Sequence, residues 1–180
     1  LFEINSSKET MIGANDMLYN HLQKVVRIRV RSRGVCHRDE SQEKTLFEEK
    51  GLDVCQKFVK QIVVVESHGG GHCMCCGDPT FEFYDEADEN VAMIAFHHGR
   101  SIRWYKGNWP CDMLLTPESA KFLVQRLADN GVTGPLNELM RGERQRQALR
   151  RRQIIYGGII PRDIHEAVNN SQSDDDLKNV

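Results

Sequence analysis

The chain has 180 residues, of which 39% are hydrophobic and 28% are charged, and its formal net charge is -2. A chain of this size buries roughly 70% of the surface that its unfolded form exposes, so it needs neither disulfides nor a metal ion merely to fold. Its apolar runs are far shorter than the roughly 20 residues that cross a bilayer, which excludes a transmembrane protein, and its hydrophobic content excludes a wholly disordered one.

The amino-terminal third predicts two helices and two strands. Residues 15 to 24 carry apolar side chains at helical spacing. Next, Val26, Ile28 and Val30 alternate with arginines, which indicates a half-buried strand with an arginine row facing outward. After a polar loop over residues 33 to 44, we expect a helix from Thr45 to Lys60, which Gly51 weakens or divides, and a strand from Ile62 to Glu66.

The middle of the chain predicts an antiparallel meander. Gly99-Arg100 is typical of a two-residue hairpin turn. Such a turn would place His98 opposite Ser101, so His98 would share a face with Arg103 and His97 would lie on the other face. The predicted strands are His72 to Cys76, Thr80 to Tyr84, Val91 to His97 and Ser101 to Tyr105.

The carboxyl-terminal third predicts helices. Thr116-Pro117 supplies a cap and a first-turn proline, and Asn130-Gly131 ends that helix. A second helix runs from Pro135 and ends before Gly157-Gly158, and Pro161 begins a short last one. The fold class is therefore α+β, with helices flanking an antiparallel sheet. We expect one globular domain over residues 1–168 and a flexible polar and acidic tail over residues 169–180.

Soft metal ligands gather in one stretch of the sequence. Thiolate and imidazole are the ligands that tetrahedral zinc uses. From this stretch we predict a zinc site made of Cys73, Cys75, His98 and Cys111, although the Cys-x-Cys spacing differs from the Cys-x2-Cys of a zinc knuckle. The stretch holds four of the six cysteines and four of the seven histidines: His68, His72, Cys73, Cys75, Cys76, His97, His98 and Cys111.

Two other interpretations of the thiols stay open. Free cysteine is among the most buried residue types, so the thiols could be reduced, buried and without a ligand. They could also be reactive. A disulfide framework is disfavoured because the chain shows no secretory signal pattern and is large enough to fold without one. From the same observation we expect a cytoplasmic protein, although the chain begins at Leu1 rather than at a methionine.

An enzyme hypothesis uses residues of the same region. Cys75 would be a nucleophile paired with His97 or His98, and Arg103 would stabilise an anionic centre. A metal-bound water near these residues is a variant of the hypothesis. Asp78, Asp112 and Glu66 are equally good candidates for a third, orienting group. The sequence therefore completes no catalytic constellation.

Arginines are concentrated in two windows, residues 27–38 and 141–152, which together hold eleven of the fifteen. The small net charge thus conceals strong local fields. On a helix, Arg144 and Arg151 predict either a solvated face or a surface for an acidic protein partner. The pI near 6.4 makes nucleic acid a less favoured partner, and nothing in the chain indicates a membrane.

Four segments carry a resemblance: Cys73 to Asp78, Phe81 to Asp85, His97 to Trp104, and Trp109 to Asp112. The chain resembles a group of bacterial proteins with a Cys-x-Cys-x-Gly-Asp segment and a His-His-Gly-x-Ser-Ile/Leu-Arg-Trp segment before a helix. The resemblance covers about a third of the chain and implies no particular reaction. Cys76 and Cys111 lie outside the shared pattern.

Two functional hypotheses follow. The first is a protein-binding domain, similar to the small immunity proteins that neutralise toxins, with a zinc ion at the Cys/His end of the fold. The second is an enzyme that uses a cysteine nucleophile or a metal-bound water near His97, His98 and Arg103.

Overall fold

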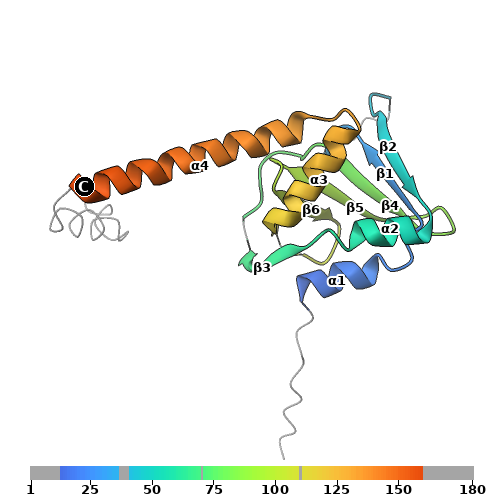
Figure 1. Ribbon diagram of the computed structural model, residues 1–180. Helices are drawn as coiled ribbons and strands as arrows, with labels where there is room; N and C mark the ends of the chain where they lie inside the picture. The colour runs from blue at the N-terminus through green and yellow to red at the C-terminus, as the bar shows by residue number, and fades with distance from the viewer. Residues whose placement is uncertain (1–12, 37–40, 70, 110, 160–180) are drawn as a thin grey trace, which may run out of the picture. The chain divides into compact units, whose positions relative to one another are not determined.

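The computed structural model describes residues 13–36, 41–69, 71–109 and 111–159 (Figure 1). Within these ranges the chain forms a seven-stranded open antiparallel sheet and four helices, which confirms the predicted α+β class. The strand order is β2-β1-β4-β5-β6-β7-β3. The elements are α1 (Ala14–His21), β1 (Arg27–Arg31), β2 (Thr45–Lys50), α2 (Leu52–Val59), β3 (Val64–Gly69), β4 (Thr80–Tyr84), β5 (Asn90–His97), β6 (Ser101–Tyr105), β7 (Met113–Leu115), α3 (Pro117–Asp129) and α4 (Gly134–Ile159).

The chain divides into two compact units, residues 1–139 and 140–180, and the first contains the whole sheet. The boundary predicted between residues 168 and 169, the acidic tail and the short helix predicted at Pro161 lie outside the described residues, so they stay predictions. In the described ranges, no helix combines the length and the apolar character needed to cross a bilayer.

One face of the sheet carries the hydrophobic core, and α2 and α3 cover it (Figure 1). Alternate strand residues point to this face, so the apolar side chains of β4 and β5 meet those of the two helices. Phe58 of α2 packs on Phe81 of β4, which in turn packs edge-on against Phe96 of β5. Each such buried aromatic side chain contributes about 1.5–3 kcal/mol. The core thereby fixes the sheet that carries the site described below.

The helix predicted from Thr45 to Lys60 is two elements, the strand β2 and the helix α2. Gly51 separates them with a φ of 95°, a conformation that glycine adopts without strain. Pairing with β1 holds β2 extended, and it places Arg27 beside Glu48 at 3.2 Å. A helical spacing of apolar residues cannot reveal such a partner, because the partner lies about 20 residues away in the sequence.

Further features differ from the predictions, and the strand expected at Ile62 to Glu66 is β3 (Val64–Gly69). Residues 72 to 76 form a loop rather than a strand, and the unpredicted β7 (Met113–Leu115) pairs with β6 and β3. The helix α4 continues through Gly157-Gly158, because a helix tolerates glycine at a cost of only about 1 kcal/mol. The predicted β4 and β6 are confirmed, and so is the cap of α3, where Thr116 Oγ1 accepts a hydrogen bond from Ser119 N at 3.3 Å.

The second face of the sheet is polar, and part of it is buried. The prediction of an outward arginine row is wrong for Arg31, which is fully buried. Its Nε donates to Glu82 Oε1 at 2.7 Å, and Arg29 and Tyr84 also donate to the Glu82 carboxylate. Burial alone would raise the pKa of Glu82, but hydrogen bonds from Arg31 and Tyr84 and the arginine charges outweigh it and leave this pKa below its ordinary value.

We expect Glu82→Gln to lower the free energy of unfolding by about 2 kcal/mol at pH 7, because it leaves a buried arginine charge less well compensated. Since the folded-state pKa of Glu82 is depressed, its contribution is present above the unfolded value of about 4.3 and is lost as pH falls through the folded value. Urea unfolding across pH 3–7 should therefore show the two proteins converging in acid. Glu89→Gln, at an exposed loop position, is the control, and a constant difference between wild type and Glu82→Gln at all pH values would contradict the argument.

Candidate metal centre

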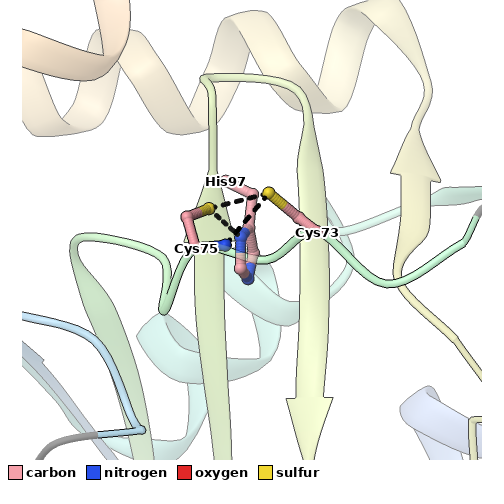
Figure 2. Close-up of side chains that lie close together, drawn as sticks. All are labelled: Cys73, Cys75 and His97. Atoms are coloured by element: carbon pink, nitrogen blue, oxygen red, sulfur yellow. Dashed lines mark hydrogen bonds between the residues drawn. The ribbon is translucent and has the colours of Figure 1, made fainter.

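Three soft ligands meet at the end of β5 (Figure 2). Cys73 and Cys75 come from the loop that precedes β4, and His97 is the last residue of β5. The Sγ atoms of the two cysteines lie 2.9 Å apart, and Cys75 Sγ lies 3.0 Å from His97 Nδ1. The three ligand atoms are all within 4.8 Å of one another. Ligand atoms of one tetrahedral zinc ion, bound at about 2.0–2.3 Å, lie roughly 3.3–3.8 Å apart, so the two thiols and the imidazole are near enough to share an ion.

His98 lies outside this group of three ligands, but it brings a fourth ligand atom close to both thiols. Its Nε2 lies 3.3 Å from Cys73 Sγ and 3.5 Å from Cys75 Sγ. Two neighbouring residues of an extended strand would point to opposite faces, but His98 has a φ of 52° and Gly99 a φ of 68°. This left-handed bend carries the His98 side chain around to the thiols. A side chain at position 99 would also collide with the carbonyl oxygen of Pro135, 2.5 Å from an added Cβ.

The register of the β5–β6 hairpin corrects the predicted faces. His97, rather than His98, lies opposite Ser101, and Ala95 lies opposite Arg103. The turn therefore has three residues, and Arg100 N donates to His97 O at 3.1 Å. A slip of one residue moves every side chain to the other face, so His97 shares a face with Arg103 while Phe96 enters the core.

An ion pair between the half-buried Arg103 and the buried Asp112 holds the backbone of Cys73. Arg103 donates from Nε and Nη2 to the two carboxylate oxygens of Asp112, at 2.6 and 2.9 Å. The same Nη2 donates to Cys73 O at 2.6 Å, and Cys73 N donates to Asp112 Oδ2 at 2.7 Å. Both backbone groups of Cys73 are thus fixed by one bidentate pair. Asp112 is one of the three orienting candidates of the sequence analysis, and its role is to position the ligand loop.

The charges at this pair reinforce each other. The hydrogen bond with Asp112 raises the pKa of Arg103, which keeps the guanidinium charged. Burial would raise the pKa of Asp112, but the hydrogen bonds from Arg103 and from the Cys73 backbone leave it below its ordinary value.

Glycine is required where the ligand loop turns toward β5. Gly77 has a φ of 71°, and an added Cβ would lie 2.8 Å from Ala95 Cβ and 2.9 Å from His97 Nε2. Only a residue without a side chain lets the loop approach β5 this closely. The approach seats Cys75 against the His97 ring.

The protonation states favour metal ligation. Burial lowers the pKa of His97, which is fully buried, so its imidazole is neutral at physiological pH. Hydrogen bonds from Cys75 and then His98 lower the pKa of Cys73, whereas burial and the neighbouring Cys73 raise the pKa of Cys75. One thiol of the pair therefore ionises first. A neutral imidazole and a thiolate are the forms that bind metals.

Two further cysteines, of which Cys111 was predicted to be a ligand, pack in the hydrophobic core or against it. Cys111, which was predicted to be a zinc ligand, packs against the hydrophobic core, and like His98 it is outside the metal-competent group found among the described residues. Unlike His98, it makes no hydrogen bond with either thiol of that group. Cys55 is fully buried in the core, and burial raises its pKa to about 11. Cys55 therefore matches the interpretation of a thiol that behaves as a small hydrophobic residue.

A pocket of about 300 Å³ adjoins the two histidines, and Glu138 lies on its wall. Glu138 Oε2 lies 3.6 Å from His98 Nδ1, the ring nitrogen that faces away from the thiols. Histidines that bind metals commonly present their second nitrogen to a carboxylate. Nothing in the sequence connected Glu138 with the site, because it follows His98 by forty residues.

Comparison with known proteins adds no assignment: no protein-family model, curated protein or solved structure matches the chain. The similarity of its motif segments to a group of bacterial proteins stays a resemblance. Any account of function therefore depends on the geometry of the site.

Proposed function

We propose that the protein is a zinc-binding, protein-interacting domain in which Cys73, Cys75, His97 and His98 hold one structural zinc ion. The observation that supports this proposal is the meeting of two thiols and two imidazoles from a loop and a hairpin turn. Such a set of two sulfur and two nitrogen atoms is a common ligand set of structural zinc. The proposal keeps Cys73, Cys75 and His98 from the sequence prediction and replaces Cys111 by His97.

The donor chemistry favours zinc over harder cations. Mg²⁺ and Ca²⁺ bind oxygen ligands, whereas thiolate and imidazole suit zinc. The nearest buried carboxylate, Asp112, is already engaged by Arg103 and by the Cys73 backbone. Four protein ligands would also leave no open position for substrate, which favours a structural role over a catalytic one.

The fit of the site extends to the groups around the ligands. Arg103 and Asp112 fix the Cys73 backbone, and Glu138 faces the outer nitrogen of His98. Such outer groups orient ligands and raise their affinity for the metal. The ion would join the loop before β4 to the end of β5 and the β5–β6 turn.

The protein-binding part of the proposal is supported by α4 beyond Leu139. Residues 143 to 154 of this helix are all exposed, and six of the residues from 140 to 154 are arginines. A polar helix of this kind suits contact with an acidic protein surface. Arg144 and Arg151 are two turns apart and lie on one stripe of the helix. Immunity proteins, which neutralise toxins by binding them, are one class of protein that would use such a surface.

We expect the full chain to bind poly-L-glutamate, and Arg144→Glu with Arg151→Glu to weaken that binding by roughly tenfold at low salt, since two attractive charges become repulsive. Fluorescence titration at increasing salt measures the effect, with duplex DNA as the second probe. Tighter binding to DNA than to poly-L-glutamate would contradict an acidic protein partner. The charge-matched control is Lys24→Glu with Lys60→Glu, at two exposed positions.

A second candidate function is supported by one geometric observation. Cys73 Sγ lies 3.3 Å from His98 Nε2, and His98 Nδ1 lies 3.6 Å from Glu138, in the order of a nucleophile, a base and an orienting carboxylate. His98 and Glu138 line the pocket. A thiol enzyme and a structural zinc site predict opposite reactivities of Cys73 toward iodoacetamide. Zinc should protect Cys73 from iodoacetamide if it is a ligand, whereas an enzyme nucleophile would react rapidly in the purified protein and slowly after His98→Gln.

A further inference from the structure

A pocket of about 290 Å³ opens between α2 and α3, the two helices that cover the core face of the sheet (Figure 1). The floor of this α2–α3 pocket is aromatic. Phe58 of α2 and Phe122 of α3 pack edge to face there, with their ring centroids 5.3 Å apart. Val54, one turn before Phe58, forms part of the wall and is 45% exposed. The pocket therefore offers a concave apolar surface that an apolar side chain of a partner can enter.

The polar rim of the α2–α3 pocket is positively charged. Arg126 of α3 donates from Nε to Glu49 Oε1 at 2.8 Å and from Nη2 to the same oxygen, so it neutralises the one carboxylate on the wall. The Nη1 group of Arg126 has no hydrogen-bond partner within the part of the chain that the structure describes. Lys57 of α2 is exposed and forms no ion pair with any described residue. One positive charge on the rim thus stays uncompensated, and it complements a carboxylate of a partner.

We propose that the α2–α3 pocket binds an acidic segment of a partner protein that carries apolar anchor residues. An apolar side chain of this segment would lie on Phe58 and Phe122, beside Val54. Carboxylates on either side of the anchor would pair with Lys57 and with the outer N–H groups of Arg126. The charge of the rim selects an acidic segment over a basic one, and the apolar floor selects a segment with an anchor over a purely acidic chain.

This inference goes beyond the proposed function, because it concerns a different surface. The pocket belongs to the compact unit of residues 1–139, whereas Arg144 and Arg151 of α4 belong to the unit of residues 140–180. None of the residues that line the pocket is a proposed zinc ligand. Binding in the pocket therefore requires neither the zinc ion nor the arginines of α4, so it can succeed or fail independently of them.

Amide NMR shifts of the full chain test the pocket with three synthetic hexapeptides. Glu-Glu-Leu-Phe-Glu-Glu carries both acids and anchors, Glu-Glu-Ala-Ala-Glu-Glu keeps the charge without the anchors, and Lys-Lys-Leu-Phe-Lys-Lys keeps the anchors with the opposite charge. We expect the first peptide to shift the amides of residues 54–58 and 122–126. It should bind roughly tenfold more tightly than either of the others, since each of those lacks one of the two complementary features.

Charge-reversal variants separate this pocket from other cationic surfaces. Lys57→Glu should weaken binding of the first peptide by roughly tenfold at low salt and strengthen binding of the lysine peptide. Because Lys57 is exposed, this change leaves the core intact. Lys106→Glu, at an exposed position after β6, is the charge-matched control and should bind as the wild type does. Arg144→Glu with Arg151→Glu should keep the preference for the first peptide over the alanine peptide.

Four results with the peptides would overturn the proposal: equal binding of the two acidic peptides, equally tight binding of the lysine peptide, shifts confined to α4, or no shifts at millimolar peptide. A result without peptide would overturn it as well. Shifts of the same amides when the protein alone is diluted would place a second copy of the chain, rather than an acidic partner, in the α2–α3 pocket.

Discussion

Replacing Cys75 by serine is expected to lower the affinity for zinc by roughly 100-fold or more. Cys75 Sγ contacts three of the other groups in the site, Cys73, His97 and His98, so it is the centre of the cluster. A structural zinc ion contributes about 10–16 kcal/mol through four ligands, so one thiolate accounts for roughly 2.5–4 kcal/mol. At about 1.4 kcal/mol per factor of ten, that is a loss of roughly 100- to 1,000-fold. A serine hydroxyl is a poor substitute because it does not ionise at neutral pH.

Competition with a zinc chelator of known affinity measures this loss. Cys111→Ser is the matched control, because Cys111 is half-buried in the same region but packs on the core. It should bind zinc as the wild type does. Equal losses in the two variants would mean that the ligand set is the one predicted from sequence, with Cys111 as a ligand. No loss in Cys75→Ser would remove Cys75 from the metal centre.

Asp112→Asn is expected to weaken both the fold and the metal centre. Asp112 is almost fully buried and accepts hydrogen bonds from Arg103 and from the Cys73 backbone. An amide has one acceptor oxygen and turns its NH₂ toward donors, so at least one of these bonds is lost and the Arg103 charge is left without its counterion. We expect a decrease of about 3 kcal/mol in the free energy of unfolding, since Arg103 is partly buried. Because Cys73 is then less well positioned, zinc affinity should fall by about 10- to 100-fold.

Arg103→Lys separates positioning from charge. Lysine keeps the positive charge but cannot make the bidentate contact with Asp112 and also reach Cys73 O. We expect it to retain part of the stability and to lose zinc affinity almost as Asp112→Asn does. Urea unfolding and chelator competition, performed on each variant, give the two quantities. A variant that loses stability while binding zinc normally would show that the pair supports the fold alone.

The elements that sequence patterns predicted well are those stabilised by local signals. The cap and first-turn proline of α3 and the alternation in β4 and β6 are written in neighbouring residues, and these elements match the structure. In contrast, β2 is a strand because β1 lies beside it, and residues 72 to 76 form a loop because Asp112 and Arg103 hold Cys73. Both depend on partners distant in the sequence.

The sequence indicated the stretch of chain that holds the candidate metal centre, but only part of its geometry. The concentration of thiols and imidazoles indicated the right stretch of chain, and Cys73, Cys75 and His98 lie together in the structure. The face on which His97 lies depends on whether the β5–β6 turn has two residues, as predicted, or three, as observed. Left-handed conformations at His98 and Gly99 then bring both histidines to the thiols. Glu138 approaches the site from α4, and no local pattern indicates such a contact.

Metal analysis of the purified full chain tests the central proposal most directly. Elemental analysis by plasma mass spectrometry should find about one zinc ion per chain in the wild type and much less in Cys75→Ser. Removal of the metal with a chelator should lower the Tm of the wild type, because a ligand bound only by the folded state stabilises it. A chain that contains no zinc, takes up none when it is added, and unfolds at the same temperature with and without chelator would contradict the proposal.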